Sequence, residues 1–344
     1  MNKISEAYSG KDILVTGGAG SIGSRLVKGL LDAGAGRVTA VDNLSASLRW
    51  NLPDDKRLRF VNADILDEKK MSRVFSDKPS KIFHLAAFFA NERSVRYPEK
   101  DLLVNGLGTL IMLRYAGAYA PESFVYASSG VSVYGRRAQI PYREEDLKAE
   151  GFTTPYQITK MLGEHYCSYF FKRDGLPAVR ARIFSSFGPG EIPGEYRNVI
   201  PNFIMKALSG EDLLITGSGQ ESRDFTYVDD VVRGLMLAGA SPEAAGEAVN
   251  IAAGREVKIL YTAERIIQLT ASKSSIRLSE KREWDSKERV LASLEKAGNL
   301  IGYKPAVSFE EGLKNTVEWI KNNYNRIKNS PNGTDDERYS IVSD

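Results

Sequence analysis

The stretch KDILVTGGAGSIGSRLVKGLL, residues 11–31, decides the fold expected for this chain of 344 residues. Its first six residues predict a short buried strand, and Ile22 to Leu31 carries apolar residues at helical spacing. Between the two lies a turn with glycines at GxxGxxG spacing, at Gly17, Gly20 and Gly23. A strand, a glycine turn and a helix in this order are typical of the start of a βαβ unit.

The alternation of strand and helix continues along the chain. Further strands are expected at 37–41, 58–61, 81–86, 122–127 and 178–183, and helices at 67–75, 99–119 and 155–173. Strands that alternate with helices predict an α/β fold, a Rossmann-type doubly wound parallel sheet.

The pattern changes beyond about residue 185, where the segments become shorter and Gly and Pro punctuate residues 188–193. We expect a Rossmann domain over residues 1–184 and a smaller C-terminal lobe over 185–328, with some of its segments returning to the first domain. A closing helix is expected at 310–328. The polar residues 329–344 predict a mobile tail.

The composition excludes several classes of protein. Charged residues make up 26% and hydrophobic residues 42% of the chain, which are the proportions of a globular protein. A net charge of +3 gives no reason to expect a nucleic-acid partner. The single cysteine, Cys167, excludes a disulfide within the chain. Because the chain also has only two histidines, His84 and His165, we expect no metal site.

The N-terminal residues MNKISEAYSGKD are polar and lack the apolar core of a signal peptide. No apolar stretch approaches the roughly 20 residues that span a bilayer. We therefore expect a cytoplasmic protein with no membrane partner. His84, inside an apolar strand, is expected to be a structural histidine, and His165 is expected on a helix surface.

The glycine turn predicts a dinucleotide site. Glycines let the backbone approach a pyrophosphate closely, and the N-terminus of the following helix offers it N–H groups and partial positive charge. Asp42 ends the next strand, about 20 residues after the last glycine, where a carboxylate binds ribose hydroxyls and repels a 2′-phosphate. NAD is therefore expected rather than NADP. Asp64, after the third strand, is either a loop carboxylate or a contact of the adenine amino group.

Tyr156 and Lys160 form Tyr-x-x-x-Lys in an expected helix, where residues four apart lie on one face. A phenol has an ordinary pKa of about 10, and a neighbouring ammonium favours the phenolate. We expect Lys160, together with a bound nicotinamide cation, to lower the pKa of Tyr156 and make it a general base. Ser129 follows the strand at 122–127, at the edge of the sheet that faces the ligand crevice.

Together these motifs make the chain similar to the extended short-chain dehydrogenase/reductase family, and within it to the NAD-dependent nucleotide-sugar epimerases and dehydratases. The resemblance runs from about Lys11 to Tyr324 and includes GGAGSIG (17–23), DNLS (42–45), HLAA (84–87), SSGVSVYG (128–135), PYQITK (155–160), GPGE (188–191) and RDFTYVDDV (223–231). It implies that Ser129, Tyr156 and Lys160 are the catalytic set. It also implies a cofactor site made of Gly17, Gly20, Ser21, Ile22, Gly23, Asp42, Asn43, Asp64, Ile65, Leu85, Ala86, Ala87, Asn105, Tyr156 and Lys160.

Two positions depart from the family pattern. Alignment by the strand places the catalytic hydroxyl at Ser129, whereas alignment by Tyr134-Gly135 places Gly130 there. We follow the strand, because it fixes position, and keep Ser128 and Ser132 as the other candidate hydroxyls. The second departure is Ser185, which stands where the family has an asparagine that contacts the sugar nucleotide.

A nucleotide-diphosphate sugar, expected to be UDP-linked, needs cations or N–H donors for its phosphates. The resemblance assigns this role to Arg223 and Asn198, and Arg282 is a further candidate in the C-terminal, substrate-binding lobe. The expected substrate site consists of Ser128, Ser129, Ser185, Asn198, Arg223 and Arg282.

The family shares a first step, the oxidation of the C4 hydroxyl of the sugar. Dehydratases and hexuronate decarboxylases usually carry a carboxylate after the catalytic hydroxyl, whereas this chain has Gly130-Val131-Ser132. We therefore expect an NAD-dependent 4-epimerase, similar to UDP-glucose 4-epimerase, that acts on a UDP-hexose, N-acetylhexosamine or hexuronate. The alternatives are a 4,6-dehydratase with an acid from elsewhere, such as Glu92 on the loop after the fourth strand, a C4 oxidase or dehydrogenase, and a non-catalytic NAD-sensing module.

The long helices expected at 99–119 and 155–173 carry apolar positions beyond one face. The resemblance implies that they pair with those of a second copy in a four-helix bundle, and a homodimer is therefore expected. The alternative is that other parts of the same chain cover them.

Overall fold

Residues 11–31 fold as their pattern predicts, with β1 (Asp12–Thr16) leading through the glycine turn into α2 (Ser21–Asp32). The structure, a computed structural model, describes residues 3–135, 139–147, 150–195, 198–282 and 287–330. Gly17 has a φ of +68°, and a Cβ there would lie 2.7 Å from the backbone nitrogen of Ala86. A Cβ on Gly23 would lie 2.0 Å from the carbonyl oxygen of Gly17. The tight turn therefore requires glycine at both positions.

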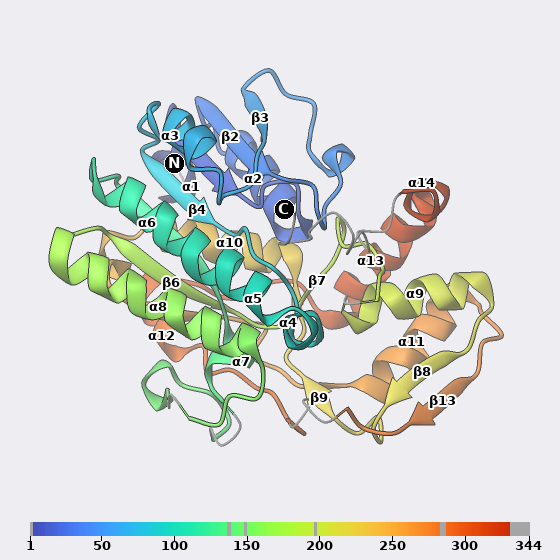
Figure 1. Cartoon of the computed structure of the whole chain (residues 1–344). Coiled ribbons are helices and arrows are strands. Elements are labelled where there is room, and N and C mark those ends of the chain that lie inside the picture. The colour runs from blue at the N-terminus through green and yellow to red at the C-terminus, as the bar shows by residue number, and fades with distance from the viewer. Residues whose placement is uncertain (1–2, 136–138, 148–149, 196–197, 283–286, 331–344) are drawn as a thin grey trace, which may run out of the picture.

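A parallel sheet forms the centre of the molecule (Figure 1), and the order of its seven strands among the described residues is β11-β6-β5-β4-β1-β2-β3. This confirms the predicted Rossmann-type doubly wound sheet. Besides β1, its strands are β2 (Arg37–Asp42), β3 (Leu58–Asn62), β4 (Lys81–His84), β5 (Ser123–Ser129), β6 (Ala178–Ile183) and β11 (Ala248–Ile251). The order reverses between β1 and β4, and a crevice opens beyond the carboxyl ends of the strands at such a point.

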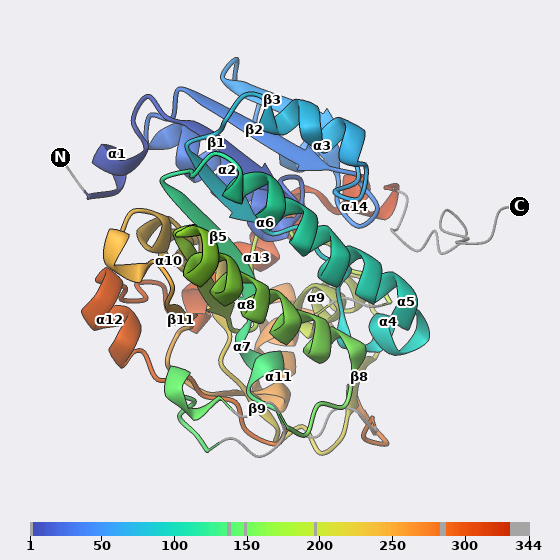
Figure 2. The same cartoon turned by 60° about the vertical axis from the view of Figure 1, so that its left-hand side comes forward.

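Helices cover both faces of the sheet, as Figure 2 shows from the side. Ile13 and Val15 of β1 point into the core beneath α2, α10 (Val228–Gly239) and α12 (Glu295–Ile301). Leu14, between them, points to the opposite core beneath α3 (Glu68–Phe75), α6 (Thr109–Gly117) and α8 (Pro155–Asp174). Neighbouring residues of a strand point to opposite faces, so a strand that is apolar throughout is buried on both sides.

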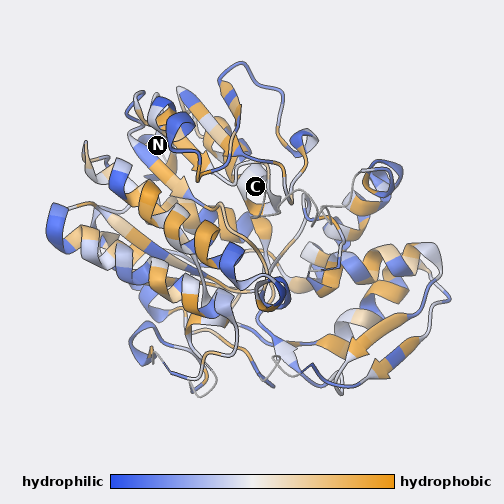
Figure 3. Cartoon of the chain, viewed as in Figure 1, coloured by the Kyte–Doolittle hydropathy of each residue, from blue (hydrophilic) through white to orange (hydrophobic). Residues whose placement is uncertain are grey.

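A separate apolar cluster lies in the C-terminal part of the chain, where α9 (Val199–Ser209), α11 (Ile259–Thr270) and α13 (Phe309–Asn322) pack together with β8 (Leu213–Thr216). Figure 3 shows the matching concentration of apolar residues in β8, α9 and α11. β8 pairs in parallel with β13 (Ile276–Ser279). Since β11 joins the central sheet, the chain does return to the first domain after residue 185, and the domain boundaries themselves stay a prediction.

Several elements differ from expectation. The helix expected at 99–119 consists of α5 (Pro98–Asp101), a π-helical segment η2 (Leu102–Gly108) and α6. The helix expected at 310–328 is divided into α13 and α14 (Tyr324–Lys328). An N-terminal helix, α1 (Lys3–Tyr8), was not predicted; it is held by Tyr8, whose buried hydroxyl donates to the carbonyl of Met236 at 2.5 Å. Of the tail expected at 329–344, residues 331–344 lie outside the described residues.

The remaining elements are α4 (Asn91–Arg96), α7 (Gly130–Val133), β7 (Ser186–Phe187), β9 (Ser222–Arg223), β10 (Thr226–Tyr227), β12 (Val257–Lys258) and the short turns η1 (Arg49–Asn51), η3 (Glu144–Asp146) and η4 (Pro242–Ala244). None of the helices in the described part of the chain is both long and apolar enough to cross a membrane.

Candidate active site

A cavity of about 860 Å³ opens at the carboxyl ends of β1, β2, β4 and β5 and is closed on its other side by the C-terminal part of the chain. The register of the sheet brings these ends together, because Thr16 pairs with His84 and Ser129 pairs with Ile183. All the site residues predicted from the sequence line this cavity except Asn105. The parallel sheet thus collects residues that lie far apart along the chain.

The glycine turn and the start of α2 form one end of the cavity. Gly20 precedes α2 without a side-chain cap, so the first N–H groups of the helix face the cavity end. Asp42 lies beside the turn: its Oδ2 accepts from the N–H of Ala19 at 3.0 Å, and its Oδ1 accepts from Ser47 Oγ at 2.7 Å. A donor-rich turn next to a fixed carboxylate fits a pyrophosphate joined to a ribose.

Asn43 and Asp64 form a polar pair at the ends of β2 and β3. Asn43 Nδ2 donates to Asp64 Oδ2 at 2.8 Å, and Asp64 Oδ1 accepts from the N–H of Leu66 at 2.9 Å. Asp64 is therefore a loop carboxylate by its contacts, and it also lines the cavity. Each carboxylate oxygen can accept a second hydrogen bond, so these contacts leave room for an adenine contact.

Asn105 is not among the residues that line the cavity, so its predicted place in the cofactor site stays a prediction. Its side chain is buried beneath the segment that follows β4, where Oδ1 accepts from the N–H of Phe88 at 2.8 Å and Nδ2 donates to the Phe88 carbonyl at 3.1 Å. Nδ2 also donates to Asp101 Oδ1 at 2.7 Å. Asn105 thus fixes the backbone of a cavity-lining residue instead of lining the cavity itself.

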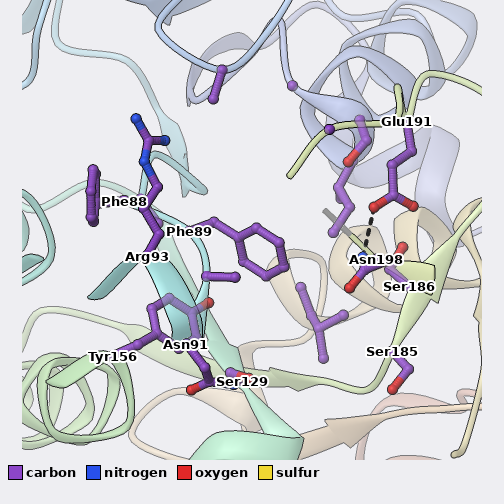
Figure 4. A pocket seen from close by; sticks show the side chains of 18 of the residues that line it. Phe88, Phe89, Asn91, Arg93, Ser129, Tyr156, Ser185, Ser186, Glu191 and Asn198 are labelled. Carbon is purple, nitrogen blue, oxygen red and sulfur yellow. Dashed lines mark hydrogen bonds between the residues drawn. The ribbon is translucent and has the colours of Figure 1, made fainter. Parts of the chain in front are cut away.

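Tyr156 and Lys160 lie on the first turns of α8, at the centre of the cavity wall. Thr154 caps this helix by accepting from the N–H of Gln157, and Pro155 occupies its first position. The ring of Tyr156 meets the ring of Phe89 edge-on, with 5.9 Å between centroids (Figure 4). Lys160 Nζ lies 5.6 Å from the centroid of the Tyr156 ring and donates to the carbonyl of Ala127 at 2.9 Å.

Lys160 by itself does not bring the pKa of Tyr156 below its ordinary value, and the combined effect of Lys160 and a nicotinamide cation stays a prediction. Burial raises the pKa of Tyr156, the charge of Asp101 raises it further, and a hydrogen bond with Ser129 opposes both effects. Burial also lowers the pKa of Lys160 to about 8. Removing both groups from water disfavours their charged forms. A nicotinamide cation is the further positive charge expected beside the phenol.

Ser129 is the serine whose hydroxyl is placed at the cavity. Ser129 Oγ donates to Ser132 Oγ at 2.9 Å, and both residues line the cavity. Gly130 faces the core instead, since a Cβ there would lie 2.0 Å from the ring of Phe184. Ser128 Oγ points to the buried carboxylate of Glu164, to which it donates at 2.6 Å. The geometry therefore favours Ser129 over Gly130 and Ser128, with Ser132 as its neighbour.

Replacing Ser129 by alanine is expected to lower kcat by about 10- to 100-fold, the loss of one hydrogen bond to a charged group in the transition state. Ser132→Ala, which removes only the partner of Ser129, should lower kcat less. Steady-state kinetics of both variants measures the difference. A larger loss in Ser132→Ala would move the catalytic hydroxyl to that residue.

The C-terminal part of the chain supplies the opposite wall, with Ser185, Ser186, Glu191 and Asn198 across from Tyr156 in Figure 4. Asn198 Nδ2 donates to Glu191 Oε1 at 2.6 Å, and Arg223 Nη1 donates to the carbonyl of Ser222 at 2.9 Å. Arg282 forms an ion pair of 3.1 Å with Glu92, which the structure places on α4 and not on a loop.

Sequence reasoning missed other residues that line the cavity, among them Phe88, Phe89, Arg93, Lys206 and Lys287. The two phenylalanines follow directly on the Leu85–Ala87 segment, so their position after a strand end was a usable signal. Lys206 and Lys287 lie in the C-terminal part of the chain, where no local pattern marks a residue that faces the cavity.

His84, His165 and Cys167 do not line the cavity. His84 is buried, with Nδ1 2.7 Å from Thr16 Oγ1 and Nε2 3.1 Å from Thr109 Oγ1, and burial lowers its pKa to about 3. His165 is exposed on α8, and Cys167 is buried. Within the described ranges, no group of three or more His, Cys, Asp or Glu side chains could hold a metal ion.

Asp101 is a buried carboxylate that contacts α8, the helix that carries Tyr156 and Lys160. It accepts from Thr159 Oγ1 at 2.6 Å and from Asn105 Nδ2 at 2.7 Å. Burial raises the pKa of Asp101 to about 6, although Thr159, the charge of Lys160 and Asn105 all oppose the rise. A carboxyl whose pKa is raised by folding stabilises the protein below its unfolded pKa, and this contribution is lost as the pH rises through about 6.

Asp101→Asn should therefore gain stability relative to the unmodified protein as the pH rises from 4 to 7, by on the order of 1–3 kcal/mol. The amide resembles the protonated carboxyl and has no charge to bury. Urea unfolding at several pH values measures the difference, with the exposed Asp54→Asn as the control. A pH-independent difference between Asp101→Asn and the unmodified protein would contradict the raised pKa.

Comparison with known proteins identifies the family of this chain. The model of the NAD dependent epimerase/dehydratase family matches residues 13–252, which include the sheet, the glycine turn and the Tyr156 helix. This chain belongs to that family. The predicted resemblance to the extended short-chain dehydrogenases/reductases is thereby confirmed, and the protein is an enzyme of the NAD dependent epimerase/dehydratase family.

Relatives from this epimerase/dehydratase family match over nearly the whole chain. The UDP-glucose 4-epimerase of Mycolicibacterium smegmatis is 32% identical over 312 residues, 90% of this chain and 98% of its own length. The dTDP-glucose 4,6-dehydratase of Shigella flexneri is 30% identical, over 94% of this chain and 96% of its own. A UDP-N-acetyl-alpha-D-glucosaminuronate decarboxylase of Bacillus cytotoxicus is 32% identical over 90% and 98%. Identity alone does not separate the three reactions.

Solved structures of family members agree closely in fold. An epimerase from Methanothermobacter thermautotrophicus is 49% identical with a TM-score of 0.94, over 96% of this chain and 97% of that one. A Bordetella bronchiseptica enzyme, solved in complex with NAD+, is 33% identical with a TM-score of 0.80, over 93% and 95%. NAD is therefore the cofactor of this epimerase/dehydratase family member, as the glycine turn and Asp42 predicted.

Proposed function

We propose that this enzyme is a 4-epimerase of a nucleotide-diphosphate sugar, with UDP as the expected nucleotide. The observation that carries the proposal is that Ser129, Tyr156 and Lys160 lie together at the cavity while no acid follows Ser129. Gly130 faces the core, and Val131 and Ser132 are the next residues at the cavity. This arrangement can take a proton from a C4 hydroxyl and return it, and none of residues 130–132 offers an acid for the elimination of water.

In this proposal Tyr156 is the general base for the C4 hydroxyl and Ser129 donates a hydrogen bond to the same oxygen. Lys160 Nζ lies 5.6 Å from the centroid of the Tyr156 ring, and together with the cationic nicotinamide of bound NAD it would support the charge of the phenolate. NAD, held by the glycine turn and Asp42, would supply the hydride acceptor and donor at C4. Because the 4-keto sugar could present either face before it is reduced again, Tyr156 would return the proton to the C4 oxygen of either epimer.

Two of the carboxylates that line the cavity are already paired with neighbouring side chains, which favours epimerisation over dehydration. Glu92, the acid that a dehydratase could have used, is paired with Arg282 at 3.1 Å. Glu191 accepts from Asn198 at 2.6 Å, on the wall across from Tyr156. A general acid for C5–C6 elimination must reach that part of the sugar, and both of these carboxylates are engaged by a neighbouring side chain.

The positive and amide groups of the opposite wall suit the diphosphate. We assign binding of the diphosphate to Arg223 and Asn198, and contact with the sugar to Ser185. The structure gives less support to Arg282 and Ser128 as substrate-binding residues. Arg282 already pairs with Glu92, and the hydroxyl of Ser128 is directed to Glu164. Binding of UDP with loss of affinity in Arg223→Met would support the assignment of the phosphates.

The decisive experiment incubates the purified protein with UDP-glucose, UDP-N-acetylglucosamine and UDP-glucuronate and follows the configuration at C4 by NMR. Epimerisation is expected without net NADH. A 4-keto-6-deoxy product would show a dehydratase, a pentose would show a decarboxylase, and accumulation of NADH with a 4-keto sugar would show a C4 dehydrogenase. Any of these in place of the C4 epimer overturns the proposal.

The partner that we propose for the enzyme is a second copy. Apolar side chains remain exposed on the adjoining helical segments η2 and α8, including Leu102, Leu107 and Ile158, together with Val95 of the neighbouring α4. Two adjacent helices with such a face can pair with themselves about a twofold axis to give a four-helix bundle. Light scattering should give the mass of a dimer, and Leu102→Lys with Ile158→Lys should give that of a monomer.

A further inference from the structure

The loop between β2 and β3 reaches from the expected adenosine end of the NAD site to the C-terminal part of the chain. Its residues Ser45, Ala46 and Ser47 line the cavity, and Ser47 Oγ donates to Asp42 Oδ1 at 2.7 Å. Three residues further on, Trp50 of η1 packs against the apolar cluster that contains α9, α11 and α13. One loop of the Rossmann domain therefore contacts both the carboxylate expected to bind the ribose and the opposite part of the molecule.

Trp50 contacts side chains of the last two helices. Its ring stacks on that of Trp319 in α13, with 5.9 Å between the centroids and 23° between the planes. The guanidinium carbon of Arg326 in α14 lies 4.3 Å from the centroid of the Trp50 ring. A stacked pair of rings and a cation over a ring are both attractive, so these three residues, which we call the Trp50 cluster, hold the loop on α13 and α14.

The residue after Trp50 fixes the same loop at the glycine turn. Asn51 Nδ2 donates to the carbonyl of Gly190 at 3.0 Å and to that of Ala19 at 3.5 Å. Ala19 belongs to the glycine turn, and its N–H donates to Asp42. The loop, the turn expected to bind the pyrophosphate and the segment that follows β7 therefore meet at η1.

A dinucleotide held between a loop and a turn can leave when the loop moves away. Residues 43–48 form neither helix nor strand, so the position of this segment depends on what holds its two ends. One end continues from β2, and the other is held by the Trp50 cluster and Asn51. Loss of the cluster would let the loop open more often, which speeds dissociation of a bound dinucleotide more than its association.

We propose that Trp50 is a positioning residue for NAD, which anchors the loop of residues 43–48 to α13 and α14 and thereby slows the release of the cofactor. None of the three members of the Trp50 cluster is among the described residues that line the cavity, so the effect acts through the loop. The inference goes beyond the proposed function, because it concerns the cofactor of the whole family and does not depend on the reaction at C4.

The competing explanation is that the Trp50 cluster only stabilises the C-terminal helices. Ile327 of α14 is 2% exposed and belongs to the same apolar cluster as Phe309 and Leu313 of α13, so α14 has another anchor. The two explanations differ in a measurable way. A contact that only stabilises the fold changes the free energy of unfolding, whereas an anchor of the loop also changes the dissociation rate of NAD.

The test measures release of NAD from the full-length protein. Enzyme loaded with radiolabelled NAD is mixed with an excess of unlabelled NAD, and the label that stays bound is followed over time. In Trp50→Leu the dissociation rate is expected to rise about 10- to 50-fold, the effect of losing one stacked ring and one cation–π contact. The association rate should change less, because the glycine turn and Asp42 are kept.

Arg326→Met tests the same anchor from the other side. Arg326 is exposed, so its replacement leaves the core intact and removes only the cation from the Trp50 ring. The dissociation rate of NAD is expected to rise about 2- to 5-fold, the contribution of a cation–π contact at an exposed site. Should Trp50→Leu fail to fold, this variant decides the question.

Tyr115→Leu is the matched control. Tyr115 of α6 also stacks on an aromatic ring, that of Phe75 with 5.1 Å between centroids, and the guanidinium carbon of Arg114 lies 5.5 Å from its own centroid. Both partners belong to α3 and α6 and not to the loop between β2 and β3. Its replacement should lower the free energy of unfolding in urea and leave the release of NAD unchanged.

Faster release in Trp50→Leu and Arg326→Met, with Tyr115→Leu unchanged, supports the inference. Unchanged release in Trp50→Leu together with a lower free energy of unfolding would assign the Trp50 cluster to stability alone and overturn it. An equal rise in Tyr115→Leu would show a general loosening of the fold and overturn it as well. None of these outcomes bears on the epimerase proposal, because no turnover is measured.

Discussion

Tyr156→Phe is expected to lower kcat by about 10²- to 10⁴-fold, the usual contribution of a positioned general base. The variant loses only a hydroxyl. The ring keeps its contact with Phe89, and Lys160 keeps its hydrogen bond to the Ala127 carbonyl. Binding of NAD should remain close to normal, because the glycine turn, the start of α2 and Asp42 are far along the cavity from the phenol and are unchanged.

Steady-state kinetics with the nucleotide sugar and calorimetric titration with NAD measure these two effects. Tyr169→Phe is the matched control: Tyr169 lies on the same helix and is 49% exposed, outside the cavity lining. It should leave both values unchanged. Unchanged turnover in Tyr156→Phe would reject the assignment of the general base, and loss of NAD binding together with turnover would show a structural defect instead.

The largest effect on stability is expected from Glu164→Leu. Glu164 and Arg182 form an ion pair of 2.8 Å with both side chains only 2% exposed. Arg182 also donates to the Tyr134 hydroxyl at 2.9 Å and to the carbonyl of Glu144 at 3.1 Å. Glu164 in addition accepts from Ser128 Oγ. These contacts join α8 to β5 and β6 directly behind the proposed catalytic residues.

Removing Glu164 leaves the Arg182 guanidinium buried without its counter-charge, so the free energy of unfolding should fall by about 3–5 kcal/mol. The double variant Glu164→Leu with Arg182→Leu should recover much of the loss, because no buried charge remains. Urea denaturation measures all three proteins.

Glu318→Gln serves as the surface control for the buried pair. Glu318 and Lys314 are 4.0 Å apart, with side chains 58% and 65% exposed. Exposed pairs contribute on the order of 0–1 kcal/mol, so this variant should be almost as stable as the unmodified protein. Equal losses in Glu164→Leu and Glu318→Gln would contradict the buried-charge explanation.

Much of the site could be predicted because its residues mark the ends of strands. Gly17, Asp42 and Ser129 each follow a buried apolar segment, and in a parallel sheet such positions meet at one edge. Tyr156 and Lys160 could be paired by helical spacing alone. These predictions depend on the local spacing of apolar residues and on the rule that the carboxyl ends of parallel strands meet at one edge of the sheet. Both can be applied to a single sequence.

The side-chain directions of Asn105 and Ser128 could not be predicted from the neighbouring sequence. Both belong to motifs of the site, yet Asn105 is hydrogen-bonded to the Phe88 backbone and the hydroxyl of Ser128 is directed to Glu164. The partners of these side chains come from segments 17 and 36 residues away. Which way a polar side chain turns depends on the donors and acceptors that packing brings to it, and these are not local.

The stretch from Lys11 to Leu31 by itself predicted a Rossmann sheet and a dinucleotide site. A turn this tight requires glycine, and the spacing of apolar residues on either side predicts the strand before it and the helix after it. The sequence alone also determined the cofactor, through Asp42. The choice of Ser129 over Gly130 followed from the strand, and the tertiary structure adds the reason, since the Phe184 ring fills the space beside Gly130. The tertiary structure alone placed Lys287 beside Val131, because a contact between residues 156 positions apart arises from packing and not from any local pattern.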